Sequence, residues 1–163
     1  MLLQELKMIE IERKFLVKSE SFIKDSYQHT RIIQGFLNTN SERTVRVRLQ
    51  GDQGYLTVKG KSTKNGLSRY EWEKDISKSD AEDLLQLCEK GIIDKVRYEL
   101  KMGFHIFEID VFFGENEGLI VAEVELKHED EAFEKPHWLG KEVTGDKRYY
   151  NSRLSQHPFK MWP

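Results

Sequence analysis

Alternation of apolar and polar residues at every second position dominates this chain. Successive side chains of a β-strand point to opposite faces, so this pattern is typical of strands with one apolar and one polar face. Eight segments follow it, and we expect strands at about 8–17, 28–38, 43–50, 54–61, 67–76, 92–102, 104–113 and 119–127. Short turns rich in glycine, asparagine and aspartate separate several of them, so neighbouring strands are expected to pair antiparallel.

Helices are expected to be few. Ser79 and Glu82 have the spacing of a capping box, apolar residues follow at helical period, and Gly91 can end the helix. Weaker helical patterns cover about 19–25, 129–134 and 145–155. The sequence therefore predicts an α+β protein with a few flanking helices, in which eight antiparallel strands can close into a β-barrel.

Composition limits the class of protein. The chain has 163 residues, of which 38% are hydrophobic, which is enough for a continuous core and excludes a disordered chain. We expect one domain over residues 1–163, ending in a helix and tail over about 145–163. No apolar run approaches the roughly 18 residues of a membrane span, so no membrane partner is expected.

Charge and cysteine usage limit the partners and the compartment. The 26 Lys and Arg residues nearly balance the 28 Asp and Glu residues, so the molecule as a whole is a poor polyanion binder and no nucleic-acid partner is expected. The start of the chain lacks the basic and apolar regions of a signal peptide. The single cysteine, Cys88, excludes an internal disulfide and fits a reducing, cytoplasmic location.

Charged residues of one sign recur in pairs at positions i and i+2 of the expected strands. Four pairs are acidic and three are basic: Glu10 and Glu12, Glu71 and Glu73, Glu108 and Asp110, Glu123 and Glu125, then Arg46 and Arg48, Lys59 and Lys61, Lys95 and Arg97. The residue between the two charges is apolar in six of the seven pairs. These strands therefore have one apolar face and one charged face.

A sheet with one solvated face is the ordinary explanation of any single pair. Such a face usually mixes signs, because opposite charges at neighbouring positions stabilise a sheet and like charges repel. Seven pairs of like sign favour charged faces that point into a closed barrel. Isolated buried charges are very costly, so some of these charges must pair and the rest must bind counterions.

The two signs suit two kinds of ligand. Carboxylate clusters supply the hard oxygen ligands that Mg²⁺ or Mn²⁺ prefers. Arginine and lysine clusters suit phosphate oxygens, which arginine can contact through two nitrogens at once. Both clusters in one cavity predict a polyphosphate bound together with a divalent metal.

Glu10, Glu12 and Lys14 form an E-x-E-x-K motif on the first expected strand. The motif resembles the opening motif of the CYTH superfamily, the triphosphate tunnel metalloenzymes. The resemblance continues along the chain at 34–37, 46–48, 56–59, 66–73, 95–98, 107–112, 122–125 and 142–149. It implies an eight-stranded antiparallel tunnel that binds a linear triphosphate and a divalent metal. The short bacterial members are mainly expected to hydrolyse inorganic tripolyphosphate.

Site roles can be assigned from the resemblance. The phosphate chain is assigned to Lys14, Arg46, Arg48, Lys59 and Arg97. The metal is assigned first to Glu10, Glu12, Glu123 and Glu125. The other two acidic pairs are further metal ligands, water holders or partners of the basic side chains, namely Glu71, Glu73, Glu108 and Asp110.

Three lysines have other roles in this scheme. Lys95 is the candidate catalytic base if neighbouring cations depress its pKa, and otherwise it is a phosphate contact. Lys61 has the parity of an interior residue and is expected near the tunnel mouth. Lys147, in the expected C-terminal helix, is either a further substrate contact or part of a solvated helix face.

Alternative functions stay open. Within the same superfamily these are a class IV adenylate cyclase and a thiamine or nucleoside triphosphatase, although no dedicated base-recognition motif is evident. A different class of protein would be a non-catalytic polyphosphate-binding module. The four acidic pairs argue against such a module, because simple anion binding favours fewer carboxylates.

Three further features accompany the resemblance. Many bacterial members have tyrosine where this chain has Phe36, and a phenyl ring cannot form the hydrogen bond of a phenol. Phe36 therefore either alters rate and substrate preference or merely packs the wall. Met8 lies where such chains commonly begin, so residues 1–7 are expected to be an extension or a misassigned start. Assembly as a homodimer is compatible with the sequence.

Overall fold

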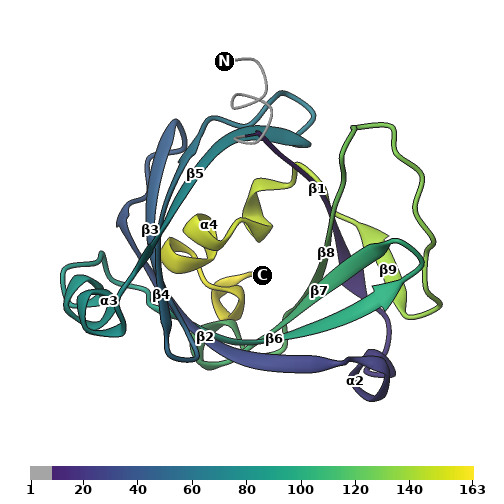
Figure 1. The fold of residues 1–163 in the computed structure, drawn as a ribbon, viewed down its shortest axis with the longest axis horizontal. Helices are drawn as coiled ribbons and strands as arrows, with labels where there is room; N and C mark the ends of the chain where they lie inside the picture. Colours follow the sequence, from purple (N-terminus) through teal and green to yellow (C-terminus); the bar gives the residue numbers. More distant parts are fainter. Residues whose placement is uncertain (1–8) are drawn as a thin grey trace.

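The computed structural model describes residues 9–163 (Figure 1). The expectation of an extension over residues 1–7, and a strand start at Met8, lie outside the described residues. No helix within residues 9–163 is long and apolar enough to cross a membrane.

Eight antiparallel strands close into a barrel, as predicted. Their bounds are β1 Ile9–Val17, β2 Gln28–Asn38, β3 Arg43–Gln50, β4 Gln53–Gly60, β5 Ser68–Ile76, β6 Ile93–Met102, β7 His105–Phe112 and β8 Ile120–Glu125. The strand order is β5-β4-β3-β2-β6-β7-β8-β1, and β1 pairs back onto β5 through Ile9 opposite Tyr70. This last pairing removes both sheet edges, so the strands enclose an interior (Figure 1).

A ninth strand, β9 (Leu139–Glu142), was not predicted. It pairs with the second half of β1, beyond the point where β1 leaves β5. Its four residues, Leu-Gly-Lys-Glu, are too few to show a period of two. The barrel wall is therefore completed along β1 by two different partners, β5 at one end and β9 at the other.

The main hydrophobic core lies outside the barrel wall. Helix α2 (Phe22–Asp25) and the segment 127–138 cover the outer faces of β1, β6, β7 and β8 (Figure 1). Phe22 and Phe107 both pack edge-on against Trp138, with ring centroids 5.8 Å and 5.5 Å apart. Burial of each large apolar side chain contributes about 1.5–3 kcal/mol. Much of the barrel's stability therefore comes from its outer layer.

Helix α3 (Lys78–Leu85) packs on the outer wall formed by β3 and β4. Its N-cap is Ser77, whose hydroxyl accepts from Asp80 N at 3.0 Å, and the prediction of a start at Ser79 is wrong by two residues. The prediction that Gly91 ends the helix is also wrong. Backbone bonds from each residue of 86–88 to the third residue before it tighten the chain after Leu85, which ends the α-helix there.

Two glycines of the wall allow this close approach. A Cβ on Gly54 would lie 2.8 Å from Ala81 Cβ of α3, and a Cβ on Gly35 would lie 2.6 Å from Ile92 Cδ1. Cys88 lies in the same contact, with its Cβ 2.9 Å from that Gly35 position, and is partly exposed. Both glycines are needed because any side chain would displace the layer outside the barrel.

Helices in the C-terminal third differ from the predictions. Residues 129–134 form no helix, because Phe133 is drawn onto the wall, where its ring contacts Phe15 and Phe107. The continuous helix expected over 145–155 is broken by the extended backbone of Tyr150. Short elements replace it: η2 Lys147–Tyr149, α4 Asn151–Gln156 and η3 Phe159–Met161, while η1 (Gly114–Asn116) links β7 to β8. The weaker helix expected at 19–25 is confirmed as α2.

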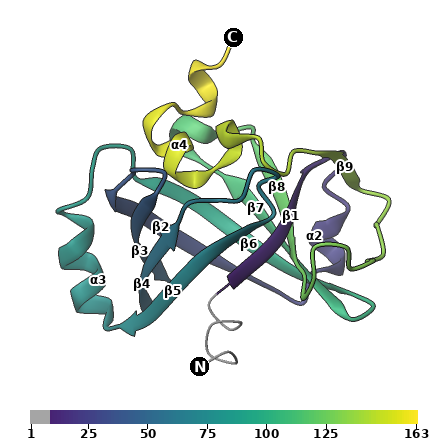
Figure 2. The same ribbon diagram turned by 90° about the horizontal axis from the view of Figure 1, so that it is seen from above.

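The C-terminal elements cover one end of the barrel (Figure 2). Leu154 of α4 and Tyr149 are buried in a second apolar cluster with Phe112 and Val121, which lie on β7 and β8. This cluster fixes α4 over the opening. The opposite end of the barrel carries the β6–β7 turn.

The glycine contacts of α3 lead to a stability prediction. Gly54→Ala should lower the free energy of unfolding by about 1–3 kcal/mol, because the new Cβ overlaps α3. Gly60→Ala is the matched control on the same strand, since its Cβ would meet no atom closer than 3.4 Å. Its effect should stay below about 1 kcal/mol. Urea denaturation followed by circular dichroism measures both, and equal losses would contradict the tight packing of α3.

Candidate functional site

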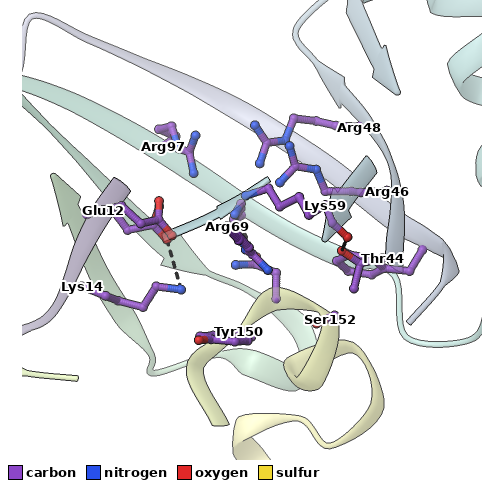
Figure 3. A pocket seen from close by; sticks show the side chains of 14 residues that line it. Glu12, Lys14, Thr44, Arg46, Arg48, Lys59, Arg69, Arg97, Tyr150 and Ser152 are labelled. Atoms are coloured by element: carbon purple, nitrogen blue, oxygen red, sulfur yellow. Dashed lines mark hydrogen bonds and ion pairs between the residues drawn. The ribbon is translucent and has the colours of Figure 1, made fainter. Parts of the chain in front are cut away.

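One cavity inside the barrel collects charged side chains from most of the strands (Figure 3). The empty space among these side chains, counted together with the solvent it opens to, is about 470 Å³. Seven cations line it against two carboxylates, Glu12 and Glu123. The cations are Lys14, Arg46, Arg48, Lys59, Arg69, Lys95 and Arg97. An excess of positive charge in an enclosed space is a site for a multiply charged anion.

The structure brings most of the sequence-predicted residues together, and four of them line other cavities. Glu10, Glu71, Glu73 and Asp110 are ion-paired to cations of the cavity. Glu108 pairs with Arg97 and, with Glu125, lines a second cavity at the β6–β7 end of the barrel. Lys61, one residue beyond β4, and Lys147 line a third cavity at the α4 end.

Lys59 is held by two carboxylates from neighbouring strands. Its Nζ donates to both oxygens of Glu10 at 2.9 and 3.0 Å, and it lies 3.2 Å from Glu71 Oε2. Burial and a hydrogen bond with Glu10 raise the pKa of Glu71 to about 7. Burial alone would raise the pKa of Glu10 too, but Lys59 outweighs it and holds that pKa well below the usual range. The two carboxyl groups therefore share a proton near neutral pH.

Two buried polar atoms of this region have no hydrogen-bond partner among the described residues. They are Arg46 Nε and Glu71 Oε2. Arg46 otherwise donates through Nη2 to Thr57 Oγ1 at 3.1 Å and lies 3.5 Å from Glu73. A buried donor or acceptor without a partner is costly and is rare in folded proteins. An anion at Arg46 would remove this cost, whereas Glu71 Oε2 already lies 3.2 Å from the Lys59 ammonium.

Asp110 joins two cations on the adjacent strand. Its carboxylate accepts two hydrogen bonds from Arg97, at 2.8 and 2.9 Å, and lies 2.8 Å from Lys95 Nζ. Burial would raise the pKa of Asp110, but Arg97 and Lys95 hold it well below its usual range. Burial lowers the pKa of Lys95 to about 7, with Arg97 and Arg48 adding to the effect against Asp110. Lys95, fully buried, can therefore exchange a proton near neutral pH.

Glu12 carries the strongest repulsion among the carboxylates that line the cavity. Burial, together with the charges of Glu123 and Glu10, raises the pKa of Glu12 to about 8. Glu123 differs, since Lys14 lies 3.4 Å away and outweighs burial to lower its pKa to about 2. Within residues 9–163 no three such ligands converge into a ready-made metal site. The carboxylate oxygens of Glu12 and its acidic neighbours still suit a divalent cation, which would relieve the repulsion among these carboxylates.

A hydrogen-bond network connects α4 to the barrel interior. Asn151 Oδ1 accepts from Lys95 Nζ and from Gln34 Nε2, both at 2.9 Å. Gln34 Oε1 in turn accepts from Arg48 Nε at 3.0 Å. The network links Lys95 and Arg48, on different strands, through Asn151 of α4 and Gln34 of β2. Phe36, 4% exposed, lines the same cavity.

Sequence reasoning missed Arg69, Tyr150 and Asn151 as parts of the cavity. Arg69 precedes Glu71 by two residues, so strand parity places it on the same face and could have identified it. Its guanidinium lies 5.4 Å from the centre of the Tyr150 ring, and Lys14 Nζ lies 5.2 Å from the same ring centre. No sequence pattern pointed to Tyr150 or Asn151, because their position depends on how the C-terminal elements dock.

The closed barrel and its cation-rich cavity define the class of protein, an anion-binding tunnel. The family model of the CYTH domain matches residues 8–156, and the chain belongs to this family. This confirms the resemblance found in the sequence.

Two relatives and one solved structure extend the comparison. An inorganic triphosphatase of Acetivibrio thermocellus is 46% identical over 152 residues, which cover 93% of this chain and 96% of the relative. An inorganic triphosphatase of Nitrosomonas europaea is 40% identical over 152 residues, with 91% and 97% covered. The crystal structure of an inorganic triphosphatase superposes with a TM-score of 0.64 at 37% identity, covering 90% of this chain and 93% of that one.

The contacts of Asp110 lead to a stability prediction. Asp110→Asn removes the charge shared by Lys95 and Arg97 and should cost about 3–5 kcal/mol of unfolding free energy, because buried cations lose their partner. Asp94→Asn is the control, since the Arg31–Asp94 pair is largely exposed and should be worth about 0–1 kcal/mol. Thermal and urea unfolding compare the two variants. A loss of under 1 kcal/mol for Asp110→Asn would refute the role of this buried cluster.

Proposed function

We propose that this chain hydrolyses inorganic triphosphate to diphosphate and phosphate inside the barrel, and does so with a divalent metal. The observation that carries the proposal is the cavity itself, in which seven cations gather and the buried donor Arg46 Nε has no partner. The relatives named inorganic triphosphatase match nearly the whole chain. The chain is accordingly an enzyme, a phosphoanhydride hydrolase, as the sequence predicted.

The cations of the cavity hold the phosphate chain in this proposal. We assign this role to Lys14, Arg46, Arg48, Lys59 and Arg97, and add Arg69, which lines the same space. Burial, with repulsion from Arg46 and Arg97, lowers the pKa of Arg48 to about 9. A polyanion between these guanidinium groups would relieve the repulsion, so part of the binding energy comes from strain already present in the free protein. Lys61 and Lys147 are assigned to the substrate at the α4 end.

The acidic residues would hold the metal, Mg²⁺ or Mn²⁺. We assign the metal to Glu10, Glu12, Glu123 and Glu125, with Glu71, Glu73 and Glu108 as supporting ligands or water holders. Asp110, bonded to two cations, acts as their partner instead. A bound divalent cation would neutralise phosphate oxygens and favour attack at phosphorus. Because no three of the described ligands converge, phosphate oxygens are expected to complete the coordination.

Hydrolysis requires a water molecule to attack the terminal phosphorus while the bridging P–O bond breaks. The electron pair of that bond leaves with diphosphate, and the proton of the water must be accepted. Lys95 is the assigned base, because a pKa of about 7 leaves a neutral fraction of its amine at neutral pH. The surrounding guanidinium groups stabilise the charge that develops on the phosphate oxygens.

The alternatives from the sequence have weaker support. A cyclase or a thiamine triphosphatase needs room for a ring beside the phosphates, whereas the cavity is lined almost entirely by charged and polar groups. A binding module would gain most from fully charged lysines, and the low pKa of Lys95 works against that. A cytoplasmic location, the absence of a nucleic-acid partner and assembly as a homodimer stay predictions.

A phosphate-release assay tests the proposed function. Tripolyphosphate, ATP and thiamine triphosphate are each supplied with Mg²⁺, Mn²⁺ or a chelator. We expect release from tripolyphosphate with metal, at least about tenfold less from the other two, and none with the chelator. Glu12→Gln should lose about 10²-fold or more in activity, as removal of one strong electrostatic contact typically does. Release from none of the substrates would favour the binding module, and faster release from ATP would reject the assigned substrate.

A second prediction concerns Asn151, which we regard as a positioning residue for Lys95 and Arg48. Asn151→Leu removes the acceptor of Lys95 and Gln34 and should lower kcat about 10²-fold, since small misplacements of reacting groups have effects of that size. KM should change less. Asn151→Asp keeps the acceptor, but its negative charge should raise the pKa of Lys95, so kcat should recover only at higher pH.

Ser155→Ala is the control for the Asn151 variants. Ser155 is buried on the same helix, but its hydroxyl bonds to Lys90 O at 3.4 Å, away from the cavity. Steady-state kinetics and urea unfolding are measured for all three variants. Equal losses of kcat in Asn151→Leu and Ser155→Ala would mean that α4 docking, rather than the Asn151 carbonyl, controls the rate.

A further inference from the structure

The third cavity opens at the α4 end of the barrel, and we call it the vestibule. It is lined by the 39–41 and 61–66 turns and by the C-terminal elements. Thr44, Arg69, Tyr150 and Ser152 line both the vestibule and the tunnel cavity. The two spaces therefore meet at these four side chains, and Tyr150, whose ring lies near both Lys14 and Arg69, is at the junction (Figure 3).

The vestibule is positively charged and free of carboxylates among its described lining residues. Its cations are Lys61, Lys64, Arg69, Lys147 and Arg153. Within the described part of the chain, all of these except Arg69 lack a carboxylate within 4.0 Å. Four unpaired cations beside hydroxyl-bearing turns form a surface that attracts anions.

The opposite end of the barrel has the reverse charge. Glu99, Glu108, Glu125 and Glu131 line the cavity there, with Lys127 as the one lysine or arginine among the described lining residues. Burial and the charge of nearby carboxylates raise the pKa of both Glu99 and Glu125. An anion that approaches this end meets repulsion, whereas one that approaches the vestibule meets attraction. The charge of the lining residues therefore changes sign from the acidic end of the tunnel to the vestibule.

We propose that the vestibule is a separate anion-binding site, which captures the triphosphate from solution and passes it into the tunnel at the α4 end. The inference rests on the proposed function for the identity of the substrate, but the site itself would bind any short polyphosphate. Substrate then reaches the cavity past Arg69 and Tyr150. The acidic end takes no part in substrate capture.

The test compares two double variants that each remove two positive charges at opposite ends. Lys64→Gln with Arg153→Gln changes the vestibule, and Lys101→Gln with Lys127→Gln changes the acidic end. At low ionic strength, kcat/KM for tripolyphosphate should fall about tenfold in the vestibule variant with kcat unchanged. The control variant should stay within about twofold. The difference should vanish near 0.5 M salt, where charges are screened beyond a few Å.

A binding measurement separates this inference from the proposed function. Calorimetric titration with tripolyphosphate in the presence of a chelator requires no turnover. Weaker binding by the vestibule variant alone supports the site even if the chain hydrolyses no triphosphate. Equal affinities for the two variants, or an equal fall of kcat/KM in both, would overturn the inference.

Discussion

The outward orientation of the apolar residues is the constraint on which the rest of this structure depends. A β-barrel usually fills its interior with apolar side chains. Here the large aromatic residues Phe22, Phe107 and Trp138 lie outside the wall, under α2 and the 127–138 segment. Apolar burial outside the wall therefore stabilises the fold, and the interior does not have to supply most of that stability. It can hold charges that would be too costly in an ordinary core, provided that most of them are paired.

Only some of the cations inside the barrel are paired with carboxylates. Asp110 satisfies Arg97 and Lys95, and Glu10 with Glu71 satisfies Lys59. Arg48 has no carboxylate within 4.0 Å in the described chain, and Arg46 Nε lacks a hydrogen bond. The ion-paired side chains hold the shape of the cavity. The unpaired cations are the ones that gain favourable contacts when an anion binds. Such preorganisation lowers the cost of ordering side chains when an anion binds.

Strand parity explains why so much of the barrel and the cavity could be predicted from the sequence. An i, i+2 pair such as Lys95 and Arg97 fixes which face of a strand is charged, and burial of the other face fixes the register. The same rule predicts that Arg69 faces the interior, because Glu71, two residues later on the strand, does so. It fails for β9, which is too short to show a period, and for Asn151, whose position depends on long-range docking of the C-terminal elements. Local patterns specify faces, whereas contacts between distant segments must be seen in the structure.

The contacts of Lys95 show how its amine is oriented although Phe36, in the tunnel wall, cannot form a hydrogen bond with it. A phenyl ring offers no hydrogen bond, so the amine must be oriented by other groups. Asp110 of β7 and Asn151 of α4 provide two acceptors, at 2.8 and 2.9 Å from Nζ. An ammonium group has three N–H bonds, and two of them are fixed in this way. Lys95 also lines the cavity where the phosphate chain is proposed to lie. Two acceptors from other strands and helices therefore orient its amine at this cavity without a contribution from residue 36.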